Sequence, residues 1–443
     1  MNRKKLLMWA MGAGALAAAL LPMLRIARIL ASAGVDIPSN DETGLLPRFL
    51  GQVLAGHYNW LHLPRDVYVN GHVVALPSLV YVVLARFDHL HLYPALFGSL
   101  LLDFVSLLLF YDAATFRSRS RVPLAAAVLL PFLSLMAFSV TQMSVFEYPL
   151  QTINAGLSGF GFALGIWVLT RWPGHTRSVA GAVAGGFIAS FSYANGITLW
   201  LIFPAVMLLL GFKRRAHYAA VILGGAVSIG VYGYVMRADH FGGSGLAHIF
   251  NPGFVVAGIG RAFANDLNTS FTPTPFTLLV GALGMVLLAL ELLIGWRQLR
   301  GPRHQEYVPA IGIAAFGLLS LLQVSMFRSL LAPWYTGLAM YVWIAVASLA
   351  YLLWSDKTEP DARPPKFCLR GAAGISIVAV LAILAVCSNR SYSDKSFLLK
   401  NRAPVSAACM RYFGTAPTYC QQFMASWSPG RVSTVARESS AGP

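Results

Sequence analysis

The sequence predicts an all-α fold, a polytopic bundle of about eleven transmembrane helices with a long first external loop that carries a juxtamembrane helix. The 443 residues are 57% hydrophobic and only 11% charged, whereas a soluble domain carries about 25% charged residues. Apolar stretches of about twenty residues recur along the chain, and each is long enough to cross a hydrocarbon core about 30 Å thick. The stretches are continuously apolar and lack the alternation of a β-barrel, so they favour helices.

The predicted spans follow one another along most of the chain. They cover residues 6–30, 92–114, 122–140, 157–171, 179–193, 197–212, 217–236, 274–295, 307–327, 334–354 and 371–388. The first span has the basic start of a secretory signal peptide, but its apolar part is longer than the usual roughly 7–15 residues. Arg25 and Arg28 also stand where a signal peptide has a neutral region. We therefore expect an uncleaved first helix.

Positive charge falls between the spans. The formal net charge is +16, and basic residues gather in alternate connections at 2–5, 117–121, 171–177, 213–215, 297–304 and 355–370. The positive-inside rule places all six in the cytoplasm. With this alternation of cytoplasmic and external connections, the N-terminus lies in the cytoplasm and the C-terminus on the external side. In a bacterial inner-membrane protein the external side is the periplasm. We therefore explain the positive charge by membrane topology and by contact with anionic lipids, and we expect no nucleic-acid partner.

We expect one integral membrane domain over residues 1–388 and a short external tail over 389–443. The two long external connections are residues 34–73 and 237–273. In the first, 43–55 has the apolar spacing of an interfacial amphipathic helix. Residues 74–88 are too short for an easy span and are predicted to be a half-inserted helix. The tail holds Cys409 and Cys420, for which a disulfide and two unrelated thiols remain equally open.

Two adjacent acids, Asp41 and Glu42, follow the first span. A carboxylate at a membrane boundary can deprotonate a hydroxyl group or hold a metal ion, so both residues are candidate catalytic groups. The competing interpretation is helix capping, because Asp41 can accept hydrogen bonds from the first turn of the interfacial helix. The sequence position of these acids alone favours helix capping, whereas the polar residues that follow them favour a catalytic role.

Further polar residues crowd the same loop and are candidate substrate-binding groups. They are His57, Asn59, His62, Arg65, Asn70 and His72. Histidine can ligate a metal or contact phosphate, but none of these has the i, i+4 spacing of a helical zinc pair. The cofactor is therefore unknown, and a divalent cation (Mg or Mn) held by Asp41, Glu42 and His72 stays open. The competing interpretation of each histidine is a polar group at the membrane surface.

Three arginines are candidate ligands of a phosphate group. Arg25 and Arg28 lie on one face of the first helix near its outer end, and Arg328 lies in a short external turn. Arginine binds phosphate in a bidentate manner. The competing interpretation for the first two is that their side chains reach up to lipid headgroups.

Polar groups also occur at the outer end of the third span and within the second. Glu147, a candidate substrate-binding residue, stands near Gln142, Gln151 and Asn154. Such groups should face a cavity or one another rather than lipid. Asp103 lies in the middle of the span 92–114, and the sequence does not identify its partner.

The layout resembles the GT-C superfamily, multi-pass glycosyltransferases that use polyprenyl-phosphate sugars. The resemblance is carried by a single span over 6–30, the acids of "NDE" at Asn40 to Glu42, and the juxtamembrane helix at 43–55. It implies that Asp41 or Glu42 is the catalytic base, although family members often show separated acids and this chain has adjacent ones. It also implies that an external arginine or histidine, for which Arg328 is our candidate, holds the donor phosphate.

The resemblance implies an inverting transfer of sugar from a polyprenyl phosphate to a glycan, lipid or cell-envelope acceptor on the external face. The lipid phosphate is a good leaving group, so the reaction needs a base on the acceptor and positive charge at the phosphate. A cell-envelope polysaccharide polymerase or ligase is an alternative, although its important loop usually comes late in the chain. A lipid or solute transporter without chemistry is another, although it should show charges at mid-membrane depth, where we see little besides Asp103.

Overall fold

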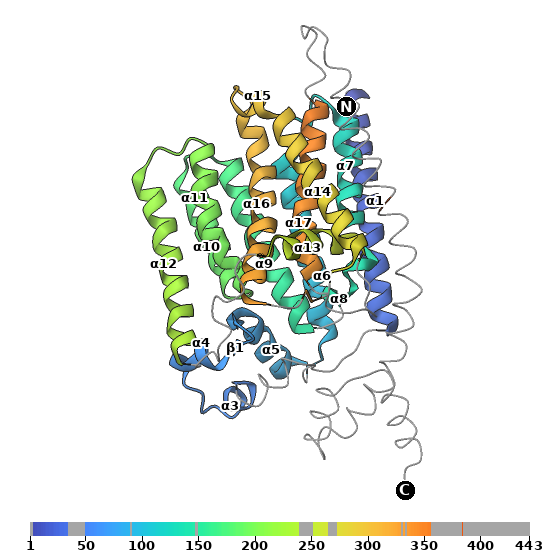
Figure 1. The fold of residues 1–443 in the computed structure, drawn as a ribbon. Coiled ribbons are helices and arrows are strands. Elements are labelled where there is room, and N and C mark those ends of the chain that lie inside the picture. Colours follow the sequence, from blue (N-terminus) through green and yellow to red (C-terminus); the bar gives the residue numbers. More distant parts are fainter. Residues whose placement is uncertain are drawn as a thin grey trace.

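The computed structural model shows an all-α polytopic bundle (Figure 1). It describes residues 3–33, 49–88, 91–146, 149–238, 251–264, 273–328, 331–332 and 335–355, together with Ile383. Several predicted features lie outside these residues. They are the acids Asp41, Glu42 and Glu147, the span 371–388 apart from Ile383, and the cysteine-containing tail.

Eight of the described helices are long and apolar enough to cross a membrane. They are α1 (Arg3–Ala33), α6 (Tyr93–Thr115), α7 (Pro123–Ala137, extended by the 3-10 helix η3, Val140–Gln142), α9 (Pro149–Arg171), α12 (Arg215–Ala238), α14 (Pro275–Ile294), α16 (His304–Phe327) and α17 (Thr336–Ser355). Each overlaps a predicted span, although α9 begins at Pro149 and not at residue 157 as predicted. Several begin at a proline, which has no amide hydrogen to leave unpaired in a first turn.

Shorter helices complete the bundle. They are α3 (Gly51–Leu54), η2 (Trp60–His62), α4 (Leu63–Asp66), α5 (Ala75–Phe87), α8 (Met143–Phe146), α10 (Thr176–Ser190), η4 (Ala194–Thr198), α11 (Leu199–Leu209), α13 (Pro252–Ala264) and α15 (Trp296–Leu299). Two predicted spans correspond to α10 and to η4 with α11, which are shorter than an ordinary span. Helix α5 agrees with the prediction of a short helix after the first loop.

Helix α13 lies in a segment for which the sequence analysis expected only a long loop. Phe254, Ile259 and Phe263 of this helix are buried in the bundle. The helix packs on α14 and α17, and the indole of Trp343 donates a hydrogen bond of 3.0 Å to the carbonyl oxygen of Ile259. The apolar spacing in this stretch would have identified the helix.

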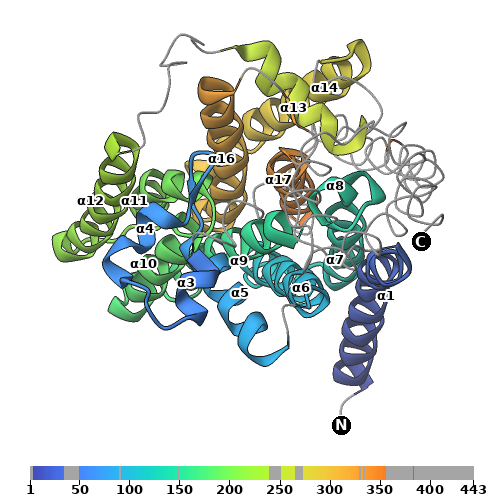
Figure 2. The ribbon, with the colours of Figure 1, turned by 90° about the horizontal axis from the view of Figure 1, so that it is seen from below.

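The two ends of the bundle differ in what they carry (Figure 1). We call the end with residues 49–88 the loop face, and the end with the start of α1 and with α15 the opposite face. Seen from the loop face, α1 lies at one edge and α12 at the other, with α17 between them (Figure 2). Helix α17 is the most buried of the eight long helices, so its side chains contact several neighbours.

Close packing of α9 on α10 depends on two glycines. A Cβ on Gly161 would overlap the carbonyl oxygen of Gly185, and a Cβ on Gly185 would overlap that of Gly161. Small residues allow helix backbones to approach closely in membranes, where packing rather than water exclusion holds helices together. The pair therefore fixes the helix hairpin whose far end forms part of the loop face.

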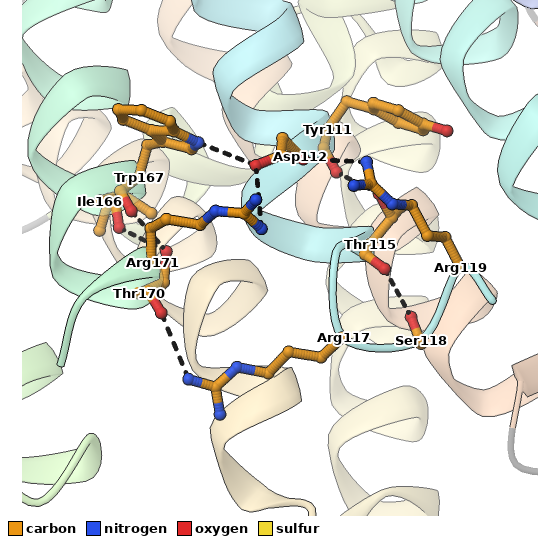
Figure 3. Close-up of polar contacts among 10 residues, drawn as sticks. All are labelled: Tyr111, Asp112, Thr115, Arg117, Ser118, Arg119, Ile166, Trp167, Thr170 and Arg171. Atoms are coloured by element: carbon orange, nitrogen blue, oxygen red, sulfur yellow. Dashed lines mark hydrogen bonds and ion pairs between the residues drawn. The ribbon is translucent and has the colours of Figure 1, made fainter. Parts of the chain in front are cut away.

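An ion-pair network ties helices together at the opposite face (Figure 3). The Asp112 carboxylate of α6 accepts hydrogen bonds from Trp167 at 2.9 Å and Arg119 at 3.1 Å, and Arg171 lies 3.8 Å away. Arg121 pairs with Glu306 of α16. These basic residues belong to the connections that the sequence assigned to the cytoplasm, and the structure shows that several of them also join α6, α9 and α16.

Candidate functional site at the loop face

A two-stranded hairpin forms the centre of the loop face. Strands β1 (Tyr68–Val69) and β2 (His72–Val73) pair antiparallel, with Tyr68 opposite Val73 and Val69 opposite His72. Asn70 and Gly71, which connect them, have φ angles of 50° and 86°. Positive φ at both positions is the type I′ turn that Asn-Gly favours. The sequence analysis treated Asn70 only as a polar group, although the dipeptide is a strong signal for a hairpin.

The hairpin is docked on the connection between α10 and α11. The backbone amide of Val73 donates to the Tyr232 hydroxyl at 3.1 Å, and that hydroxyl donates to the carbonyl oxygen of Ser190 at 2.9 Å. The imidazole of His72 lies 4.4 Å from the ring of Tyr193, centroid to centroid. The loop is therefore held against the bundle by specific contacts from α12 and the α10–α11 connection.

Gly196 makes this connection possible. A Cβ on Gly196 would collide with the backbone of Ala189 and Ser190. The glycine is needed because η4 lies directly on the end of α10. Gln323 of α16 also donates a hydrogen bond of 3.2 Å to the carbonyl oxygen of Ala194.

Arg328 extends from the end of α16 to the hairpin. Its guanidinium donates a hydrogen bond to the backbone carbonyl oxygen of Asn70. No carboxylate within the described part of the chain pairs with it. A guanidinium has five N–H donors, so Arg328 has donors beyond the one that contacts Asn70 with which it can bind an anion.

His72 is neutral in this position. Burial of its imidazole, together with the smaller effect of the nearby positive charge of Arg328, lowers the pKa to about 3. The Nδ1 atom accepts a hydrogen bond of 3.2 Å from the backbone amide of Ala194. The neutral ring must then carry its proton on Nε2. His72 can thus donate one hydrogen bond to a ligand, but it does not supply a positive charge.

We expect docking of the hairpin to weaken in acid. Above pH 6.5 His72 is neutral whether docked or free, so the histidine adds no pH dependence there. Between pH 6.5 and about 3 the free hairpin binds a proton that the docked hairpin does not, so the opening equilibrium should rise by up to about tenfold per pH unit as pH falls. Hydrogen exchange of amides 68–73, corrected for intrinsic rates, measures this opening.

Two variants separate His72 from the other histidines of the loop. His72→Gln should remove this pH dependence, because glutamine does not titrate, whereas His57→Gln should keep it, because His57 is exposed. An unchanged acid-induced opening in His72→Gln would show that another group controls the docking.

A cavity with a few polar groups among mostly apolar lining residues lies next to the docked hairpin. Its volume is about 80 Å³, and its lining residues come from α6, α7, η3, α8, α9, the α10–α11 connection and α17. Tyr193 joins the two regions, because it stacks on His72 and also lines the cavity. Gln142 and Gln151 line it too, in agreement with the expectation that polar groups of this region face a cavity.

The other predicted arginines lie away from the hairpin. Arg25 and Arg28 are exposed on α1, which packs on α7 and α6 at the edge of the bundle away from α16 (Figure 2). The structure therefore brings Arg328 together with Asn70 and His72, and it does not bring Arg25 or Arg28 to that place.

The remaining loop residues have mixed roles. His57, His62 and Arg65 are exposed, and the Asn59 side chain caps η2 by accepting the Leu61 amide at 3.1 Å. Within the described residues no three histidine, cysteine, aspartate or glutamate side chains gather into a metal-ion site. Asp41 and Glu42, two of the three candidate ligands, lie outside those residues.

Comparison of the sequence with family models and curated proteins identified no relative. No protein-family model matches the chain, and no curated protein shows significant sequence similarity to it. The functional proposal that follows therefore rests on the residues, their geometry and the resemblance described above.

Proposed function

We propose that this chain is an integral membrane glycosyltransferase that moves a sugar from a polyprenyl-phosphate donor to a glycan, lipid or cell-envelope acceptor on the external face. The supporting observation is Arg328, which lies at the loop face beside Asn70 and His72 without a carboxylate partner among the described residues. A guanidinium at a membrane boundary suits a lipid-linked phosphate. The positive-inside rule makes the loop face external.

The proposed reaction is a single displacement at the anomeric carbon. The acceptor hydroxyl oxygen forms the new bond, the bond from the sugar to the phosphate oxygen breaks, and polyprenyl phosphate leaves with the electron pair. Asp41 or Glu42 takes the hydroxyl proton, and Arg328 stabilises the negative charge on the departing phosphate. Configuration at the sugar inverts, because there is one displacement.

A transporter is the second candidate, and the cavity inside the bundle favours it. Polar and ionisable groups at membrane depth mark solute or ion paths in many membrane proteins. A transporter would move its solute without forming a covalent product, so the two candidates differ in a directly measurable way.

The test is release of polyprenyl phosphate by the purified protein in liposomes, with a panel of synthetic polyprenyl-phosphate sugars, glycan and lipid acceptors with free hydroxyl groups, and detection by mass spectrometry. We expect Asp41→Asn or Glu42→Gln to slow release by about a hundredfold, which is the usual contribution of a general base. Insertion and folding should be unchanged. Asp88→Asn, which changes an acid at the end of α5, is the matched control.

Two outcomes would count against the proposal. Wild-type release rates in both acid variants would remove the assignment of the base. No release by the wild-type protein for any donor, together with flux of a solute into the liposomes, would favour the transporter.

A further inference from the structure

Asp103 projects into the cavity from α6 at a place where other polar groups meet. A Cβ built on Gly159 of α9 would lie 2.7 Å from the Tyr341 hydroxyl and 3.8 Å from an oxygen of Asp103. The absence of a side chain at Gly159 therefore makes room for both groups. Tyr341 is held in place by edge contacts with Phe162 and Phe316, at centroid distances of 5.6 and 4.9 Å.

The neighbouring amides leave oxygen atoms for an occupant. The Nε2 atom of Gln142 donates to the carbonyl oxygen of Ala262 at 3.3 Å, and that of Gln151 donates to the Tyr193 hydroxyl at 3.4 Å. Both glutamines line the cavity, and no protein donor reaches their Oε1 atoms in the described part of the chain. Together with the Asp103 carboxylate, these two oxygens give the cavity three groups that can accept from or coordinate an occupant.

Among the described residues, the lining of the cavity includes one acidic residue, Asp103, and no lysine, arginine or histidine. An ionised carboxylate inside a membrane bundle is costly unless a positive charge accompanies it. One carboxylate balances one positive charge, whereas divalent ions are usually held by several carboxylates or by carboxylates with phosphates.

We propose that this cavity is a binding site for a small monovalent cation, held by the Asp103 carboxylate and the amide oxygens of Gln142 and Gln151. The volume of about 80 Å³ is several times the roughly 10–15 Å³ that one water molecule needs. It therefore has room for an ion with a few waters or for the ammonium group of an amine. The inference goes beyond the proposed function, since it needs neither the sugar donor nor the first-loop acids.

The test measures thermal unfolding of the purified full-length protein in nanodiscs at constant ionic strength. N-methyl-D-glucamine chloride is replaced stepwise by NaCl, KCl or methylammonium chloride. We expect the Tm of the wild-type protein to rise and saturate with at least one of these ions, because a ligand that binds only the folded state stabilises it. Saturation by an alkali ion identifies an inorganic ion, and saturation by methylammonium alone identifies an amine.

Variants decide whether the ion binds in this cavity. Asp103→Asn should abolish the rise in Tm, and Gln151→Met should move its midpoint to roughly tenfold higher ion concentration, since one oxygen that holds the cation is lost. Asp88→Asn should behave as the wild type. The proposal fails if no ion raises the wild-type Tm or if the rise persists in Asp103→Asn. Should Asp103→Asn not fold, an unchanged midpoint in Gln151→Met would overturn it.

Discussion

Replacing Arg328 with glutamine is expected to slow sugar transfer by about a thousandfold, because the variant loses the positive charge that would stabilise the departing phosphate. Arg328 donates one hydrogen bond to the carbonyl oxygen of Asn70, and its other donors are free for the donor lipid in our proposal. Arg328→Lys keeps a charge but loses the planar fork that binds phosphate in a bidentate manner. It should therefore recover only part of the rate.

The measurement is single-turnover release of polyprenyl phosphate, with Arg86→Gln as the control. Arg86 is an exposed arginine of α5, so its loss changes the charge of the loop face without touching the hairpin. Hydrogen exchange of residues 68–73 is measured in parallel. A slow Arg328→Gln variant with an opened hairpin would show that Arg328 positions the loop, and an unchanged rate would remove it from the site.

The helices were predictable because the membrane imposes a length and a composition on each span. Hydropathy identified segments such as 92–114 and 307–327, which correspond to α6 and α16. The short helices were harder to predict. Helix α10 has 15 residues, and its end depends on the contact of η4 with Ala189 and Ser190, which a hydropathy pattern does not contain.

The site was only partly predictable, for a different reason. Residue type and topology identified Arg328 and the loop residues as polar groups on one side of the membrane. The contact between Arg328 and Asn70 joins residues 258 positions apart, and it depends on a hairpin that was not predicted. Likewise, Asp103 was visible as an acid within a span, but its neighbours Tyr341 and Gly159 come from other helices. Such pairings follow from tertiary packing rather than from sequence spacing.

Gly281→Ala is expected to destabilise the folded protein by about 3 kcal/mol, at the upper end of the usual cost of overpacking. A Cβ on Gly281 would overlap the carbonyl oxygen of Val256 in α13, and one on Gly260 would overlap that of Thr277 in α14. The obstacle in both cases is backbone, which cannot rotate away as a side chain can. Helices α13 and α14 would have to separate.

Thermal unfolding in nanodiscs measures this cost, and Gly233→Ala is its matched control. Gly233 also lies within a helix, α12, but no heavy atom lies within 4 Å of the position of its Cβ. Alanine is the better helix former by up to about 1 kcal/mol, so the control should be neutral or slightly stabilised. Equal stability of the two variants would show that the α13–α14 contact is not tight in the membrane.

Gly281→Ala should also weaken cation binding in the cavity. The carbonyl oxygen of Ala262 in α13 accepts hydrogen bonds from Thr141 at 2.7 Å and from Gln142 at 3.3 Å. A displaced α13 would therefore release the amide that directs the Gln142 oxygen into the proposed cation site. Gly281→Ala should raise the ion concentration needed for half-maximal stabilisation, whereas Gly233→Ala should not. An unchanged midpoint in a destabilised Gly281→Ala protein would mean that Gln142 holds its place without α13.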